Sequence, residues 1–352
     1  MRIKAFSPTI RRKEMDAVLT ALVEDSLGPG EYATRLLQVA KEYIGYDYGI
    51  PLRSPVFALY YALKALDLPR GSGVVISALS PFYYLQVLED LGLEPVLVDV
   101  EESTGNMSGA TIQKGIQQKR AHLSGESLES FTVRACVLHY TLGYVPEIQP
   151  ILDLGLPLIE DCSRSFGTNI GEQRVGSFGV FTLLGLEERD LFTAGGGCLL
   201  YAMNRREGTV LRRWSTLPPE YRLPDVNAAM ATVQFKESER NYEKRRAIAE
   251  VYTQAALQSR HKRFINPDTA EYNNYCFPLV LQSGAKDVIA YGVKKEVEIA
   301  LAFQDTVVAH LEKPQDYPVA YSLSLRTVLF PFYPRLSSPM VQKVARLLAT
   351  LP

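Results

Sequence analysis

Short apolar runs alternate with longer amphipathic stretches between residues 48 and 202 of this chain. Runs of four to six apolar residues, bounded by polar residues, Gly or Pro, predict buried β-strands, and the stretches between them predict helices. The predicted strands are Val74–Ser77, Pro95–Val100, Ala135–His139, Pro157–Glu160, Thr182–Leu184 and Cys198–Tyr201. This alternation is typical of an α/β fold with a mostly parallel central sheet flanked by helices.

One helix start is marked clearly by its residue types. Ser54 is a good N-cap and Pro55 suits the first helical position, so a helix is expected from Pro55. Ala58, Tyr61 and Ala62 would then lie on its buried face. Residues 101–132 are polar and predict surface helix and loop.

The composition changes at the segment Trp214–Pro224, which is rich in proline. Beyond it the pattern predicts one long charged helix, a strand and a final helix, over Asp225–Ala256, Cys276–Leu281 and Pro339–Leu351. We therefore expect an N-terminal arm and large α/β domain over 1–224, and the long helix with a small C-terminal α+β domain over 225–352.

The overall composition excludes several classes of partner. Of the 352 residues 47% are hydrophobic and 22% charged, and the net charge of −1 gives no footprint for nucleic acid. No apolar run approaches the roughly 20 residues that span a bilayer, and the N-terminus lacks the apolar core of a signal peptide. The four scattered cysteines fit buried thiols in a reducing compartment and show no zinc spacing, so a cytoplasmic protein is expected.

The segment from Pro157 to Ala202 carries the candidate chemistry. An acidic pair, Glu160-Asp161, closes a predicted strand. Glycines then recur at fixed places: Gly167, Gly171, Gly176, Gly179 and Gly196-Gly197. This frame resembles the DegT/DnrJ/StrS family of fold-type-I sugar aminotransferases, which use pyridoxal phosphate (PLP) and read "EDxAQxxG", "GxxGxxGxxxxFSFxxxK" and "GEGG".

The resemblance extends over almost the whole chain. Matching segments are 26–30, 43–45, 92–100, 221–222, 227–229, 245–246 and 329–336. It implies the fold-type-I PLP-transferase architecture and a homodimer. It does not by itself imply the activity, because function resides in particular site residues.

The family's Schiff-base lysine position falls on Arg189 in this chain. No lysine occurs between Lys119 and Lys236, so a shift in alignment does not supply one. A guanidinium stays protonated at neutral pH and cannot attack the PLP aldehyde. We expect Arg189 to be a surface or ion-pair arginine near the acidic residues that adjoin it in the sequence.

The resemblance implies that Asp161 would hold the pyridine nitrogen of PLP. An aspartate that merely caps the following helix is the alternative. The family's phosphate cradle, "SGTxAL", reads here Ser54-Pro55-Val56, which lacks one N–H donor and one hydroxyl. The family serine of "FSF" corresponds to Leu184 or Thr182, and the asparagine that reaches the neighbouring subunit's phosphate corresponds to Glu220.

The ring-contacting positions differ as well. The family's Thr-aromatic pair corresponds to Ser80-Pro81, with Phe82 or Tyr83 as a remaining stacking face, and the glutamine of "EDxAQ" corresponds to Arg164. Arg164 and Arg189 would then line the pocket beside Asp161. Two interpretations remain open: an altered anion site, or the favoured one, a closed pocket in which Asp161 pairs with an arginine. His139 ends a strand and is interpreted as structural.

Three functions follow as hypotheses. The first is an ordinary PLP-dependent aminotransferase, and the second is an enzyme that uses PLP or pyridoxamine phosphate (PMP) in a non-standard site, for instance a dehydratase. The third, which we favour, is a non-catalytic relative linked to sugar or polysaccharide biosynthesis that binds a ligand or partner. No cofactor is predicted beyond the PLP or PMP that the resemblance implies, and the expected ligand is a nucleotide sugar or another small anion.

Overall fold

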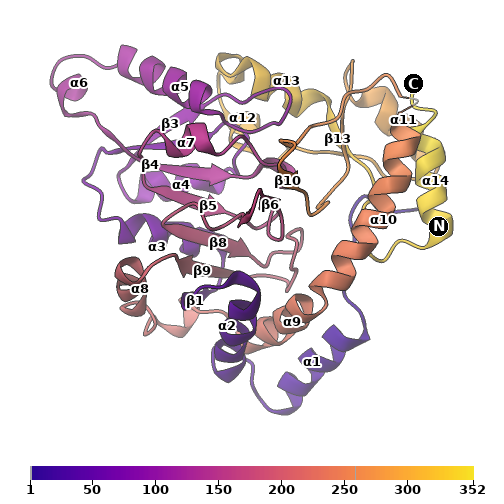
Figure 1. Ribbon diagram of the computed structural model, residues 1–352, viewed down its shortest axis with the longest axis horizontal. Helices are drawn as coiled ribbons and strands as arrows, with labels where there is room; N and C mark the ends of the chain where they lie inside the picture. Colours follow the sequence, from indigo (N-terminus) through magenta and orange to yellow (C-terminus); the bar gives the residue numbers. More distant parts are fainter. Residues whose placement is uncertain (1, 258) are drawn as a thin grey trace.

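A seven-stranded sheet forms the centre of the protein (Figure 1), in a computed structural model that describes residues 2–257 and 259–352. The strand order is β1-β9-β8-β5-β4-β2-β3. Among these strands β9 alone runs against the others. The bounds are β1 (Tyr48–Leu52), β2 (Gly73–Ser77), β3 (Glu94–Val98), β4 (Val133–His139), β5 (Leu158–Asp161), β8 (Phe181–Gly185) and β9 (Cys198–Ala202).

The mostly parallel sheet and all six strands predicted in this half of the chain are confirmed, with ends displaced by a residue or two. The strand β1 was not predicted, because Gly49 and Pro51 interrupt its run of apolar residues. A proline cannot donate to a ladder, and β1 lies at the sheet edge, where a missing donor is tolerated.

Helices cover both faces of the sheet, and successive strand residues alternate between two cores. Leu138 belongs to the core beneath α2 (Glu31–Ile44), α5 (Gly109–Ala121), α7 (Gln149–Leu152) and α9 (Asp225–Lys236). Its neighbour Val137 belongs to the core beneath α3 (Pro55–Ala65), α4 (Tyr83–Asp90) and α8 (Arg205–Arg212). This alternation is the period-2 geometry of a strand buried on both faces.

The long helix expected over Asp225–Ala256 is two helices. α9 ends at Lys236 and α10 (Ser238–Ala256) begins after Glu237, whose backbone has φ −97° and ψ 7°. The break lets the two halves pack on different partners: α9 on α2 and α1 (Arg12–Val23), and α10 on α14 (Ser338–Leu348). The domain division after residue 224 stays a prediction.

The C-terminal part contains a three-stranded antiparallel sheet in the order β11-β13-β12. Both termini lie in this part (Figure 1), and Ile3 bridges to Val297. Its elements are β11 (Pro278–Val280), α11 (Lys286–Lys294), β12 (Ala300–Leu301), α12 (Val307–His310), η3 (Pro314–Asp316), α13 (Pro318–Arg326) and β13 (Thr327–Leu329). The remaining short elements are α6 (Glu126–Ser130), η1 (Thr141–Gly143), β6 (Asn169–Ile170), β7 (Gln173–Arg174), η2 (Pro219–Tyr221) and β10 (Ala270–Glu271).

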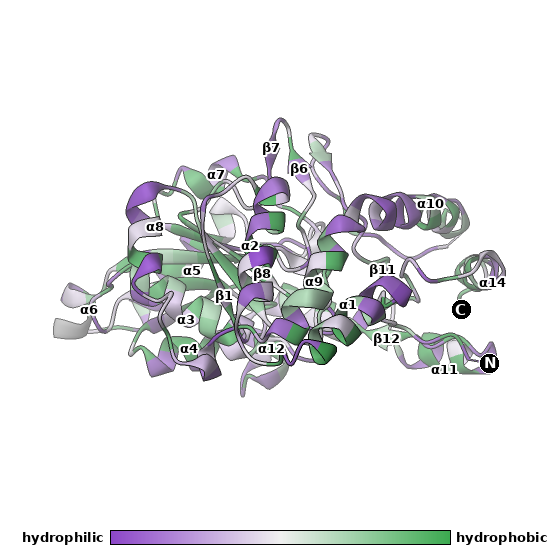
Figure 2. Ribbon diagram, turned by 90° about the horizontal axis from the view of Figure 1, so that it is seen from below, coloured by the Kyte–Doolittle hydropathy of each residue, from purple (hydrophilic) through white to green (hydrophobic). Residues whose placement is uncertain are grey.

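Hydropathy follows these layers. Figure 2 shows apolar strands inside the central sheet and a hydrophilic ribbon along much of α10. Within the part of the chain that the structure describes, no helix combines the length and apolar character that a membrane span needs.

Candidate functional site

Three neighbouring parallel strands, β4, β5 and β8, end side by side beneath the candidate site. The strand register places His139 of β4 opposite Asp161 of β5, and Asp161 opposite Leu183 of β8. The carboxyl ends of parallel strands are where open α/β sheets bind ligands. Asp161 is only 4% exposed there, so its carboxylate must find partners within the protein.

Two hydroxyl groups satisfy that carboxylate. Tyr84 of α4 donates its hydroxyl to Asp161 Oδ2 at 2.6 Å, and Ser163 donates its hydroxyl to Oδ1 at 2.5 Å and its backbone N–H at 3.1 Å. His139 Nδ1 lies 3.6 Å from Oδ2, beyond hydrogen-bond distance, in electrostatic contact. The favoured expectation that Asp161 pairs with an arginine is therefore wrong, because tyrosine and serine take the place of the arginine.

These contacts set the protonation of the pair. Burial alone would raise the pKa of Asp161, but His139, Ser163 and Tyr84 outweigh it and hold the pKa below its ordinary value. Burial and the adjacent carboxylate raise the pKa of Tyr84 well above its ordinary value. Asp161 is therefore charged at neutral pH, and Tyr84 keeps the proton that it donates.

A second buried acid, Asp190, lies beside this pair. A Cβ added at Gly185 would meet Asp190 Oδ2 at 2.2 Å and Ser163 Oγ at 2.7 Å, so all three groups share one small space. Burial raises the pKa of Asp190 to about 7, against the lowering effect of Arg164, while Asp161 raises it further. In the sequence Asp190 is recognisable only as an acidic neighbour of Arg189.

Arg189 is exposed at the turn of the 186–197 loop, which connects β8 to β9. Its carbonyl accepts a hydrogen bond from the Tyr275 hydroxyl at 2.5 Å, and Leu191 N–H donates to the Ser163 carbonyl at 3.1 Å. The expected surface position is confirmed. The expected ion pair is not found, since no carboxylate among the described residues bridges to the Arg189 guanidinium.

Ser54 and Thr182, which correspond to phosphate-binding positions of the family, form hydrogen bonds within the protein. Ser54 caps α3 by accepting from Phe57 N–H at 3.5 Å, and Pro55 occupies the first helical position. Thr182 is buried and donates its hydroxyl to the Gly176 carbonyl at 2.6 Å. Ser54 therefore acts as the helix cap that its sequence position predicts, and the Thr182 hydroxyl is committed to the backbone.

The positions expected to contact the PLP ring differ in their surroundings. Ser80 is fully buried, and Phe82 packs against His310 of α12 with ring centroids 4.4 Å apart. Tyr83 instead faces Tyr84 at 5.0 Å in a T-shaped contact, and the Asp161 charge contributes to its raised pKa after burial. Phe82 is 43% exposed, so its role as a stacking face stays a prediction, and two tyrosines of α4 lie beside Asp161.

Glu160, the other half of the acidic pair, has a structural role. Its carboxylate accepts from the Tyr140 hydroxyl at 2.6 Å and from three backbone N–H groups, those of Gly176, Phe178 and Gly179. It thereby holds the 176–179 turn onto β5.

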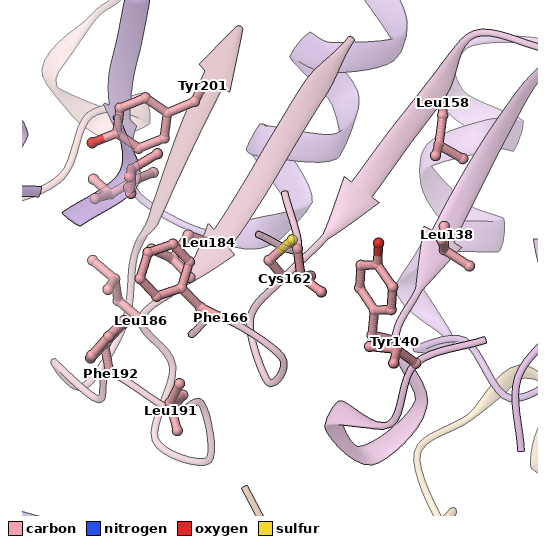
Figure 3. Packing of buried hydrophobic residues seen from close by; sticks show 14 of the residues in the cluster. Leu138, Tyr140, Leu158, Cys162, Phe166, Leu184, Leu186, Leu191, Phe192 and Tyr201 are labelled. Atoms are coloured by element: carbon pink, nitrogen blue, oxygen red, sulfur yellow. The ribbon is translucent and has the colours of Figure 1, made fainter. Parts of the chain in front are cut away.

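Figure 3 shows part of the apolar core next to the candidate site, where Leu191 and Phe192 of the 186–197 loop lie near Phe166.

The residues present do not fit PLP. The anchor for the pyridine nitrogen already accepts from Tyr84 and Ser163, and the Tyr84 side chain that would have to move is 0% exposed. No lysine lies between Lys119 and Lys236 to form the imine. The described residues also contain no group of three or more His, Cys, Asp or Glu side chains that could hold a metal ion.

One of these features was readable in the sequence. Ser163 follows Asp161 by two residues, the spacing at which an aspartate commonly accepts from a nearby N–H and hydroxyl. Tyr84 lies 77 positions from Asp161. Its contact depends on where the packing of α4 on α3 and β3 places the tyrosine, which no local pattern reveals.

Comparisons with known proteins agree with the fold. The pattern of the DegT/DnrJ/EryC1/StrS aminotransferase family matches residues 8–349. GDP-perosamine synthase of Escherichia coli O157:H7 is 22% identical, over 96% of this chain and 95% of its own. The crystal structure of the aminotransferase TlmJ from Streptoalloteichus hindustanus has a TM-score of 0.86 at 18% identity, covering 99% of this chain and 98% of its own.

A further solved structure, GDP-4-keto-6-deoxymannose-3-dehydratase with bound GDP-perosamine, has a TM-score of 0.83 at 15% identity and covers 98% of this chain and 100% of its own. The fold expected from the sequence, a fold-type-I α/β transferase, is thereby confirmed. The chain belongs to the DegT/DnrJ/EryC1/StrS aminotransferase family.

Proposed function

We propose that this chain is a non-catalytic member of its family, which binds a ligand or partner and forms no PLP aldimine. The observation that carries the proposal is the hydrogen bond of 2.6 Å from the buried Tyr84 hydroxyl to Asp161. A pyridine nitrogen would have to displace this donor and leave a buried hydroxyl unpaired, which costs about 1–3 kcal/mol. The absence of a lysine at Arg189 removes the covalent bond that offsets such a cost in the family.

The relatives indicate the pathway class. GDP-perosamine synthase and GDP-4-keto-6-deoxymannose-3-dehydratase act, by their names, on GDP-linked sugars. We infer that this chain works alongside nucleotide-sugar or polysaccharide biosynthesis, with a nucleotide sugar or related anion as its ligand. All four cysteines are free thiols, which supports a cytoplasmic location.

The proposed assembly is a homodimer. The family resemblance implies it, and an exposed apolar face on α1 supports it, because a contiguous exposed apolar patch marks an interaction site. Met15, Leu19, Leu22 and Val23 form this face.

Incubation with PLP tests the proposal. We expect no aldimine absorbance and no PLP retained on the protein after borohydride reduction, as measured by mass spectrometry. Arg189→Lys should behave in the same way, because Tyr84 and Ser163 would still occupy the Asp161 carboxylate and the Ser54-Pro55-Val56 segment would still lack the family's phosphate donors. Glu188→Lys, on the same exposed turn, is the matched control.

An aldimine on the natural chain that glutamate discharges would overturn the proposal outright. Aldimine formation by Arg189→Lys but not by Glu188→Lys would show that only the lysine is missing and that Tyr84 does not block the ring.

A further inference from the structure

A surface groove lies between α11 and α14, at the end of the molecule away from the central sheet (Figure 1, Figure 2). Its volume is about 670 Å³, comparable to that of a small-molecule pocket. Tyr291 of α11 lines it together with Pro339 and Leu347 of α14. The hydroxyl groups of Tyr291 and Thr350, 3.0 Å apart, link the two segments. The groove is separate from the site beside Asp161 and from α1, since neither contributes a lining residue.

The apolar part of the groove is the edge of the C-terminal core. Val288 of α11 and Val344 and Leu347 of α14 are buried in one hydrophobic cluster, and Tyr291 packs against it while staying partly exposed. Because Leu347 and Tyr291 also line the groove, an apolar side chain placed there would extend an existing core. Burial of apolar surface of this kind supplies the free energy of docking.

Cations surround this apolar lining. Lys295, Lys343 and Arg346 line the groove, and among the described residues that line it there is no acidic side chain. Lys343 forms a surface ion pair of 3.0 Å with Glu296, whereas within residues 2–257 and 259–352 neither Lys295 nor Arg346 bridges to a carboxylate. The Lys295 ammonium lies 5.5 Å from the centre of the Tyr291 ring, so positive charge and apolar surface adjoin directly.

The sequence shows that this positive charge is local. The chain as a whole has a net charge of −1, but after Asp316 it contains no acidic residue. The charged side chains of that last segment are Arg326, Arg335, Lys343 and Arg346. α14 therefore brings only positive charge to the groove, and the complementary partner is acidic.

The combination of cations with an apolar lining indicates the class of partner. Nucleic acid is held by rows of cations that neutralise successive phosphates, and the groove offers three, one of them already paired. A bilayer surface takes up apolar side chains that protrude from a helix, whereas Leu347 is 3% exposed and recessed. A peptide segment that carries both carboxylates and an apolar side chain matches both features of the groove.

We propose that the groove between α11 and α14 binds an acidic segment of a partner protein. An apolar side chain of that segment lies against Tyr291 and Leu347, and its carboxylates meet Lys295 and Arg346. The inference goes beyond the proposed function, because it concerns another face of the molecule and holds whether or not the chain forms an aldimine.

Selection of short random peptides displayed on phage, with the natural chain immobilised, tests the groove. We expect the selected peptides to combine acidic residues with leucine, phenylalanine or tryptophan. In fluorescence anisotropy they should bind more weakly at high salt. Combining Lys295→Glu with Arg346→Glu should weaken binding at least tenfold, because like charges would then face each other. Serine in place of the apolar residue of the peptide should have a similar effect.

Lys313→Glu is the matched control, at an exposed lysine of the C-terminal part that lies outside the groove. Circular dichroism of each variant checks that it is folded. The inference is overturned if no peptide is enriched, if the enriched peptides lack acidic residues, or if they bind the double variant and the natural chain equally. Tighter binding of a single-stranded oligonucleotide or of phosphatidylserine vesicles than of any selected peptide would also overturn it. These readouts are independent of the PLP spectrum, so the groove and the loss of the aldimine fail or stand separately.

Discussion

At the scale of single residues, the hydroxyl of Tyr84 decides what Asp161 can do. The carboxylate is charged and almost completely buried, and Tyr84 supplies one of its two side-chain donors. A neutral donor satisfies the charge without supplying a counter-charge, so the pair depends on geometry. The arrangement explains how a buried aspartate is kept at the end of β5 without a cofactor.

Tyr84→Phe removes that donor and should lower the free energy of unfolding by about 1.5–3 kcal/mol, the range for hydrogen bonds to charged groups. Urea unfolding at pH 7 measures it. Tyr201→Phe is the matched control, because the Tyr201 hydroxyl is equally buried and has no hydrogen-bond partner among the described residues. Equal losses in the two variants would show that the Tyr84 hydrogen bond contributes nothing specific.

Asp190 makes stability depend on pH. Its pKa is raised to about 7 in the folded protein by burial, against an ordinary value near 4, so the folded state binds the proton more tightly. The stabilisation is complete below about pH 4 and is lost as the pH rises through about 7. Asp161, whose pKa is lowered, acts only in more acidic solution.

Between pH 5 and pH 8 we therefore expect the natural chain to lose on the order of 2 kcal/mol of stability relative to Asp190→Asn. Urea unfolding of both proteins across that range gives the difference, in which the other titrating groups cancel. Parallel pH curves would mean that Asp190 ionises normally despite its burial.

At the scale of elements, the sequence predicted what depends on local pattern. The strands that carry the site were found because they are continuous apolar runs, and the start of α3 because Ser54 and Pro55 are position-specific. The break at Glu237 was missed because both α9 and α10 are good helix sequences. Only their different packing partners require the change in direction.

The contents of the site depended on contacts between elements. Arg189 was located at the correct loop, but its exposure follows from how Tyr275 and Ser163 hold the main chain of that loop. The partner of Asp161 came from α4, far away in the sequence. Residue identities therefore predicted what the site lacks, and only the tertiary structure showed what fills it.

At the scale of the whole molecule, the exposed face of α1 remains without a partner in a single chain. Met15, Leu19, Leu22 and Val23 are 46–77% exposed and recur at the spacing of one helical face. The opposite face of α1 packs on α9, so the helix is fixed in place and presents these side chains outward. Under the proposed homodimer, a second copy of the chain is the partner that covers this face.

We expect the natural chain to be a dimer in light scattering and sedimentation, and Leu19→Glu with Val23→Glu to make it monomeric. Two carboxylates buried at an apolar contact would each lack a partner, which costs several kcal/mol and exceeds what the face contributes. Leu325→Glu, at a leucine of α13 that is 53% exposed, is the matched control and should leave the dimer intact. A natural chain that sediments as a monomer, or a double variant that stays dimeric, would remove α1 from the interface.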